Sequence, residues 1–315
     1  MVRSSRLAAA LFFLWFALAV ATDAAPPEAV TLVFERSDDG LQTWRPVATA
    51  FMPEGLLDVP VAGQSNSVFR MRVQRLSDTK PDPAIVQVAG GTFGQDGISP
   101  HAGQSVGAFA IGKYEVTKAE WDAVLTYAVA SGYDIEGVGS ATAANHPVVN
   151  VGWRDVAKWC NAKSEMDGKT PVYTTGGLTF KRGNSNPVAN TNANGYRLPT
   201  SIEWEWAFRG GIQSLDYTYS GGNALNGVAW YQSNNSPNGT KPVGQKLPNE
   251  IGIHDMSGNV SEWCFDATLA GSGNVYSRGG DFGSATSDCV YWFRSTFISG
   301  PRTSDHGFRL ASNIQ

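Results

Sequence analysis

Two spacings of apolar residues divide the chain into regions. Residues 67–73 alternate strictly, with three apolar side chains on one face and arginines on the other, which is typical of a β-strand. Residues 30–35 are a second strand-like run, and the Asp-Asp-Gly at 38–40 is a turn signal. We therefore expect a small β-rich module at residues 27–77, too short to bury a large core of its own.

Helical spacing begins near residue 117. Thr117 and Glu120 form a capping box, in which the hydroxyl and the carboxylate satisfy reciprocal backbone amides. The residues that follow place their apolar side chains on one stripe, as an amphipathic helix requires. A second helix is expected over residues 154–166. Its apolar stripe contains Cys160, which is therefore expected to be a buried free thiol.

A third helix is expected to begin after Thr200, which forms another capping box with Glu203. Residues 170–194 are rich in Gly, Asn and Thr, so we expect them to be irregular. After residue 211 short strand-like runs alternate with turns. Few helices followed by many short strands and long loops predict an α+β fold.

The first 24 residues are typical of a signal peptide. Arg3 and Arg6 precede an uninterrupted apolar run at 7–20, and small residues suited to cleavage follow it. The run is short for a membrane span, and a retained membrane anchor is the alternative. We expect a secreted or periplasmic protein that has no membrane association after cleavage.

Composition refines this picture. The net charge is −4 with no long run of one sign, which argues against a nucleic-acid partner. Glycine (35 residues) and tryptophan (10 residues) are abundant, and charged residues are few at 17%. Residues 78–83 are polar and contain prolines, as linkers do. They separate the β-rich module from a loop-rich domain at residues 84–315.

The segment 252–264 carries the most distinctive candidate chemistry. Asp255 and Glu262 are seven residues apart and flank the turn-forming sequence Ser-Gly-Asn. Carboxylates together with exposed carbonyl oxygens are the ligands that calcium prefers. A polar loop beside a buried Trp263 is the alternative. The four histidines, in contrast, show no metal-ligand spacing.

Several short motifs occur in the order found in one enzyme family. They are Val88–Phe93, Gly112–Thr117, Pro147–Val151, Tyr196–Thr200 with Glu203-Trp204-Glu205, Pro248–Gly252, Asp255–Val260, Arg278-Gly279-Gly280 and Gly307–Leu310. Together they resemble the formylglycine-generating enzyme family, also called the sulfatase-modifying factor family. The resemblance covers roughly residues 84–315. It implies a variant of the C-type lectin fold with little regular secondary structure and bound calcium.

The resemblance assigns the calcium ligands more closely. The matching positions are the side chains of Asp255 and Glu262 and the backbone carbonyls of Gly258 and Val260. The implied role of this calcium is structural, because it would hold loops that form no strand ladders.

The resemblance also implies an enzymatic activity, but this chain has only some of the residues that the activity requires. Enzymes of the family oxidise a sulfatase cysteine to formylglycine, using oxygen and copper(I) held by two cysteines. The matching positions here are Ser284 and Cys289, and a serine hydroxyl is a poor ligand for the soft copper(I) ion. Ser261, Asp281 and Ala285 also depart from the family pattern.

Two functional hypotheses therefore stand side by side. The first is a binding or accessory protein that has kept the scaffold and lost the oxidase. Its ligand face would run from Asp281 to Trp292, and its ligand would be a protein, a sulfatase being one candidate, or a carbohydrate. The second is a copper-dependent oxidase with altered ligation through Cys289 and Ser284 or Asp281. Calcium is expected under both hypotheses, and copper only under the second.

A pairing of cysteines follows from the same resemblance. Many relatives outside the true oxidases carry cysteines at the positions of Cys264 and Cys289. A disulfide between them fits an oxidising compartment. The alternative is two free, buried thiols.

Overall fold

The computed structural model of the chain contains two compact units, Met1–Asp82 and Pro83–Gln315. The residues that the structure describes are 30–37, 45–52, 68–75, 85–266, 274–298 and 301–314. The expected signal peptide at 1–24 and the linker at 78–83 lie outside them. For the three segments before residue 76 only the backbone is described.

The first unit contains an antiparallel three-stranded sheet in the order β2-β1-β3. Its strands are β1 (Val30–Ser37), β2 (Arg45–Met52) and β3 (Val68–Arg75). Two of the three were expected, β3 from the alternation of apolar and polar residues and β1 as a strand-like run. The β1–β2 register shifts between Phe34 and Glu35, as at a β-bulge.

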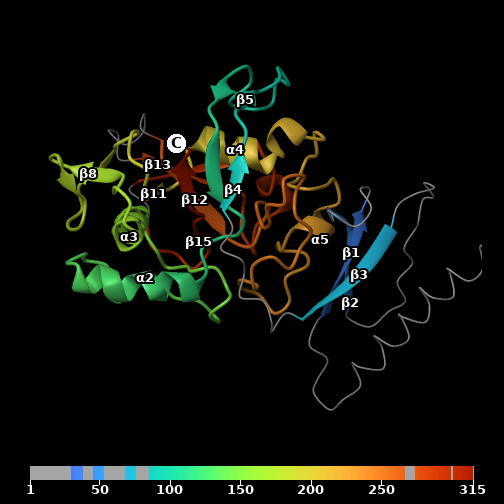
Figure 1. The fold of residues 1–315 in the computed structure, drawn as a ribbon, viewed down its shortest axis with the longest axis horizontal. Coiled ribbons are helices and arrows are strands. Elements are labelled where there is room, and N and C mark those ends of the chain that lie inside the picture. The colour runs from blue at the N-terminus through green and yellow to red at the C-terminus, as the bar shows by residue number, and fades with distance from the viewer. Residues whose placement is uncertain are drawn as a thin grey trace, which may run out of the picture. The chain divides into compact units, whose positions relative to one another are not determined.

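The second unit is built around two four-stranded sheets (Figure 1). The first has the order β11 (Tyr196–Arg197), β16 (Ala311–Asn313), β7 (Phe109–Gly112) and β4 (Ile85–Val88). The second has the order β14 (Arg294–Ile298), β13 (Asn274–Arg278), β12 (Ser261–Cys264) and β15 (His306–Gly307). Pairing is antiparallel except between β12 and β15. Strands β5 (Gly91–Thr92) and β6 (Ser105–Val106) form a separate pair.

Helices are few, as expected for an α+β fold. Those of the described segments are α2 (Lys118–Ala130), α3 (Trp153–Met166), α4 (Ser201–Phe208) and α5 (Leu225–Val228), with the 3₁₀ turns η2 (Gly211–Gln213) and η3 (Thr286–Asp288). Both predicted capping boxes are present, at Thr117 and at Thr200. In each, the threonine hydroxyl accepts from the amide of a glutamate whose carboxylate accepts from the threonine amide.

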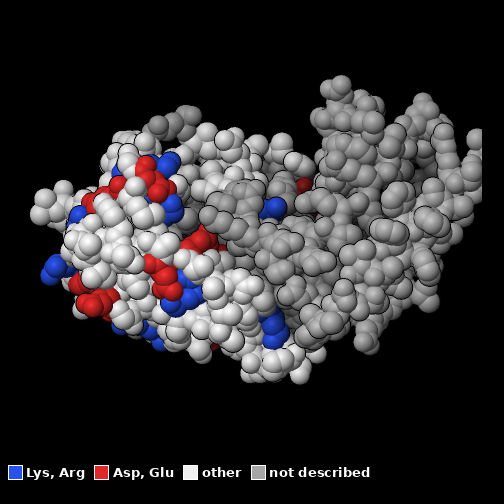
Figure 2. Space-filling view, turned by 60° about the horizontal axis from the view of Figure 1, so that its bottom comes forward, with Lys and Arg blue, Asp and Glu red and all other residues white. Residues whose placement is uncertain are grey.

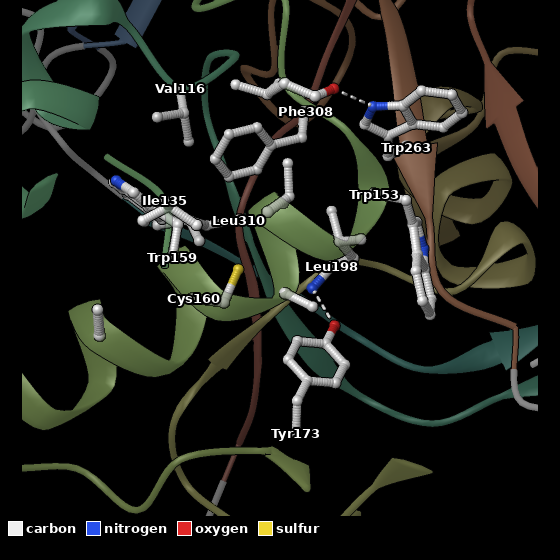
Figure 3. Packing of buried hydrophobic residues seen from close by; sticks show 14 of the residues in the cluster. Val116, Ile135, Trp153, Trp159, Cys160, Tyr173, Leu198, Trp263, Phe308 and Leu310 are labelled. Carbon is white, nitrogen blue, oxygen red and sulfur yellow. Dashed lines mark hydrogen bonds between the residues drawn. The ribbon is translucent and has the colours of Figure 1, made fainter. Parts of the chain in front are cut away.

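Tryptophans anchor the larger hydrophobic core (Figure 3). Trp121 of α2 and Trp159 of α3 stack with ring centroids 5.6 Å apart. Each of the four indoles of this core donates to a main-chain carbonyl: Trp121 to Val138 (3.0 Å), Trp159 to Trp121 (3.1 Å), Trp153 to Cys264 (2.9 Å) and Trp263 to Val151 (3.0 Å). Bulky rings therefore tie the loops at Val138 and Val151, together with α2 and β12, into one core. Cys160 is a buried free thiol among them, as expected.

The expectation of an irregular segment at residues 170–194 was wrong in part. This segment forms a small antiparallel sheet of β8 (Tyr173–Thr175), β9 (Leu178–Thr179) and β10 (Val188–Ala189), in the order β10-β8-β9. The strand β8 forms because Asn161 of α3 bonds its backbone. Its Oδ1 accepts from the Tyr173 amide (2.9 Å) and its Nδ2 donates to the Tyr173 carbonyl (2.7 Å). A buried side chain thus holds β8 in place, which local sequence does not reveal.

No helix in the described part of the chain is long and apolar enough to cross a membrane. On the face drawn in Figure 2, acidic and basic side chains are interspersed. The described part of that face therefore carries no extended patch of one sign.

Candidate functional site

A polar hollow of about 580 Å³ lies at one end of the second sheet. It is lined by Gln232, Asp281, Phe282, Gly283, Ser284, Ala285, Asp288, Ser304 and Asp305. Asp281 follows the end of β13 by three residues, and Asp305 immediately precedes β15. The hollow therefore includes Asp281 and Ser284, two of the residues expected at the functional site.

Asp281 and Ser284 are bonded to each other. The Ser284 hydroxyl donates to Asp281 Oδ2 (3.0 Å) and accepts from the Asp281 amide (3.0 Å). The other carboxylate oxygen of Asp281 accepts from the Gly283 amide (2.7 Å). Burial raises the pKa of Asp281, and the nearby Asp305 adds to this shift. The Ser284 hydroxyl thus serves to shape the loop.

Cys289 does not line the hollow. Its side chain is fully buried in an apolar cluster with Leu225, Val228, Ala229 and Tyr231. Burial raises the pKa of the Cys289 thiol to about 12, so the thiol is neutral near pH 7. Gly280 allows this packing, because a Cβ at its position would lie 3.1 Å from the Cys289 sulfur and 3.0 Å from the Asp288 carbonyl.

The expected Cys264–Cys289 disulfide is absent from the structure, in which both residues are free thiols. Cys264, the last residue of β12, packs in a cluster with Trp204 and Met256. Cys289 packs in the separate cluster around α5. The two sulfurs therefore face different parts of the core, which neither spacing nor resemblance indicated.

Trp292, expected at the ligand face, lies outside the hollow. It is half-exposed and packs edge-on against Tyr291, with ring centroids 4.6 Å apart. Two further carboxylates in the hollow belong to Asp288, which sequence reasoning did not single out, and to Asp305, which it missed. Asp288 lay within the expected face. No local pattern pointed to Asp305, which reaches the hollow only because β15 pairs with β12.

The calcium loop expected at 255–262 contains an incompletely bonded carboxylate. Asp255 Oδ2 accepts from the Gly244 amide (2.6 Å), but its buried Oδ1 has no hydrogen-bond partner among the described residues. Burial raises the pKa of Asp255 to about 6. An unpaired carboxylate oxygen at full burial is costly unless a cation or proton satisfies it. This atom fits a calcium ligand.

Glu262, the second expected carboxylate ligand, is already paired. Its Oε1 accepts from Arg309 Nη2 (2.6 Å), and its Oε2 accepts from Arg309 Nε (2.7 Å) and Trp204 Nε1 (2.7 Å). Oε1 keeps one lone pair for a further partner. Glu262 therefore fits a calcium through one oxygen, and the carbonyls of Gly258 and Val260 would complete the set.

Glu115 is a third buried carboxylate beside this loop. Its Oε1 accepts from the Val260 amide (3.1 Å) and its Oε2 from Asn259 Nδ2 (2.6 Å). Burial raises the pKa of Glu115, and the nearby Asp255 and Glu262 add to the shift. Arg309 is buried as well and pairs with Glu262, and all three carboxylates raise its pKa electrostatically. Within the described ranges, no three His, Cys, Asp or Glu side chains form a metal-binding group.

The four histidines have ordinary partners. His101 bonds Ser201 (3.3 Å), His146 bonds Thr240 (2.9 Å), His254 bonds the Lys246 carbonyl (2.8 Å) and His306 bonds Thr303 (2.9 Å). These bonds connect each histidine to a neighbouring segment of the domain.

Comparison with known proteins identifies the domain that carries these features. Residues 73–314 match the family model described as the sulfatase-modifying factor enzyme 1-like domain. The chain belongs to the sulfatase-modifying factor family. The predicted fold class is thereby confirmed, since the structural relatives share the family's fold.

The proteins similar to this sulfatase-modifying factor domain include both a chaperone and an enzyme. The chaperone protein LppX of Paenibacillus barcinonensis is 35% identical over 257 residues, covering 72% of this chain and 88% of LppX. The formylglycine-generating enzyme of Thermomonospora curvata is 27% identical over 264 residues, covering 69% and 84%. Among solved structures, CarF matches with a TM-score of 0.64 at 31% identity, covering 74% of this chain and 98% of CarF. Treponema denticola variable protein 1 matches with a TM-score of 0.60 at 30% identity, covering 73% and 95%.

Proposed function

We propose that this protein is a non-oxidase member of the sulfatase-modifying factor family that binds a polypeptide client as an accessory protein. The observation that carries the proposal is the divergence of Ser284 and Cys289. The serine hydroxyl is bonded to Asp281, and the Cys289 thiol is buried, neutral and outside the hollow. Copper(I) requires two soft ligands that converge, and these two side chains do not provide them.

The relationship to LppX supports a polypeptide client. LppX is a chaperone protein, and most of its length aligns with this chain at 35% identity. The hollow also suits a protein ligand, since it is open, polar and built from loops, where binding residues are commonly found. We place the client contact at the hollow.

We further propose that calcium stabilises the 255–262 loop and that the protein is exported. Asp255, Glu262 and the carbonyls of Gly258 and Val260 would hold the ion. The unpartnered Asp255 Oδ1 and the excess of buried carboxylates support this assignment. Calcium would supply the missing positive charge to the loop. The apolar run at 7–20 supports export.

Two measurements on the pure protein test the functional proposal. A cysteine-bearing sulfatase peptide is incubated with the protein, copper(I), oxygen and a reductant, and its mass is followed. We expect no conversion of the thiol to an aldehyde, because no thiol pair holds copper. Separately, light scattering follows the aggregation of reduced, unfolded lysozyme and of reduced, unfolded α-lactalbumin. We expect the protein to slow the aggregation of at least one of them.

Each measurement can overturn one half of the proposal. Aldehyde formation with turnover would show that the oxidase persists. Aggregation of both unfolded proteins at the same rate with and without a tenfold excess of the protein would remove the client-binding role. Serum albumin at the same concentration controls for nonspecific crowding.

A further inference from the structure

The proposed calcium loop bonds directly to the segment that forms one wall of the hollow. This wall segment, residues 279–289, contains most of the residues that line the hollow. The Gly258 amide donates to the Gly279 carbonyl (2.9 Å), and the Phe282 amide donates to the Asn259 carbonyl (2.9 Å). Two adjacent residues of the loop therefore hold the first part of the wall segment by its backbone.

A side chain of the same loop holds the far end of the wall segment. The Ser257 hydroxyl donates to the Cys289 carbonyl (2.8 Å) and accepts from the Ser220 amide (3.1 Å). All three residues are buried, so loss of the hydroxyl would leave two buried backbone groups without these partners. The calcium loop thus contacts the wall segment at both of its ends.

The carbonyl that holds the wall segment lies between the two carbonyls that would hold the ion. Gly258 and Val260 would supply their carbonyls to calcium, and the Asn259 carbonyl accepts the Phe282 amide. Asn259 has a left-handed backbone conformation with a φ of 61°. Because peptide groups are planar, an ion that fixes the two flanking carbonyls also restricts the orientation of the Asn259 carbonyl.

Charge repulsion makes this arrangement dependent on a cation. Glu115 accepts hydrogen bonds from the Asn259 side chain (2.6 Å) and from the amide of the next residue (3.1 Å). The nearby carboxylates of Asp255 and Glu262 are buried as well, and Arg309 pairs with Glu262. Ionised carboxylates repel one another strongly when they are buried together. A bound cation would relieve this repulsion and preserve the bonds that hold Asn259.

We propose that calcium bound by the loop holds the wall segment in place, with Ser257 and Asn259 as the positioning residues. Removal of the ion would leave the rest of the domain folded and loosen residues 279–289. This inference rests on the proposed function, because the wall segment belongs to the hollow where we place the client contact. Calcium would then regulate the shape of the hollow as well as stabilise its own loop.

Amide hydrogen exchange, followed by mass spectrometry of peptic fragments, tests this proposal on the full-length protein without any client. Protein in excess calcium is compared with chelator-treated protein. We expect fragments that cover residues 279–289 to exchange at least about tenfold faster without calcium, because the Phe282 amide loses its acceptor. Fragments from α2 should exchange at the same rate in both, since its buried residues pack in the tryptophan core.

The buried cysteines provide an independent measurement. Iodoacetamide labelling is resolved residue by residue with mass spectrometry. We expect Cys289 to react at least about fivefold faster in chelator than in calcium, because a looser wall segment exposes its thiol. Cys160 lies on α3 in the tryptophan core and should react at the same slow rate in both.

A matched pair of serine variants separates positioning from calcium binding. Ser257→Ala removes the hydroxyl that bonds the Cys289 carbonyl and leaves every proposed calcium ligand intact. We expect it to keep the calcium-dependent rise in thermal midpoint and to label Cys289 equally fast with and without calcium. Ser164→Ala is the control, because Ser164 is also buried and its hydroxyl donates to the Cys160 carbonyl (2.7 Å). It should retain the calcium dependence of Cys289 labelling.

A calcium-dependent thermal midpoint with unchanged exchange of residues 279–289 and unchanged Cys289 labelling would overturn the coupling. Equal effects of calcium on α2 and on residues 279–289 would also overturn it, because the ion would then act on the whole domain. Calcium-dependent labelling of Cys289 in Ser257→Ala would remove the positioning role of Ser257. Failure of the proposed function is a separate result. If calcium protects residues 279–289 but unfolded lysozyme and α-lactalbumin aggregate unhindered, the positioning stands and the client role falls.

Discussion

Ser284 and Cys289 are five residues apart, yet their side chains enter different surroundings. Ser284 lines an open, polar hollow and bonds Asp281, whereas Cys289 is buried in an apolar cluster. The sequence alone predicted the loss of one copper ligand, because a serine is visible in the chain. It did not predict that the remaining cysteine is turned away from the hollow, because that depends on packing against α5.

This difference gives a prediction for Ser284→Cys. We expect the variant to gain one thiol that reacts rapidly with a labelling reagent and to gain no tight copper(I) binding. The new thiol faces the hollow, but Cys289, with its pKa raised to about 12 by burial, would remain a neutral and inaccessible partner. Thiol counting and competition with a colorimetric copper(I) chelator measure both outcomes. Copper retained against the chelator at one equivalent would contradict the prediction.

At the scale of elements, short-range signals were the most informative. Both capping boxes are present as predicted, because each involves only four neighbouring residues. The strands were harder to locate, since many are only two or three residues long. The β8–β10 sheet depends on Asn161, and β15 depends on its parallel pairing with β12. Contacts between segments distant in sequence, such as these, leave no periodic pattern.

The loop at 255–262 gives a prediction at this scale. We expect added calcium to raise the thermal midpoint of chelator-treated protein, because an ion that binds only the folded state stabilises it. At one hundred times the dissociation constant the gain is about 2.7 kcal/mol. Asp255→Asn should lose most of this calcium-dependent shift, since it removes the unpartnered oxygen. Differential scanning calorimetry with and without calcium measures it.

The control for this experiment is Asp122→Asn, which lies on α2 and should keep the calcium-dependent shift. Magnesium at the same concentration should act more weakly, because it demands tighter octahedral geometry. An identical thermal midpoint for the parent protein in calcium and in chelator would refute the assignment.

For the whole molecule, the division into two units is the main feature. The boundary falls between Asp82 and Pro83, and each unit has its own sheets. The larger unit contains the tryptophan core, both four-stranded sheets and the hollow. Sequence composition predicted a polar, proline-containing linker at 78–83, but the sequence does not indicate how the two units are arranged.

The second unit should therefore fold without the first. We expect a fragment of residues 83–315 to have the near-ultraviolet circular dichroism of a packed aromatic core and to unfold cooperatively on heating. Its slowing of the aggregation of unfolded lysozyme or α-lactalbumin should match that of the full chain within about twofold, because the hollow lies wholly within this unit. A fragment with no near-ultraviolet signal would show that the core needs the first unit.

The buried tryptophans have a consequence for how this scaffold can diversify. Four indoles donate to the carbonyls of Val138, Val151, Trp121 and Cys264, and a main-chain carbonyl is present whatever side chain its residue carries. The anchoring of the loops at Val138 and Val151, and of α2 and β12, is thereby independent of the side chains at the accepting residues. Such a frame tolerates extensive substitution on its exterior, so one architecture can present many different recognition surfaces.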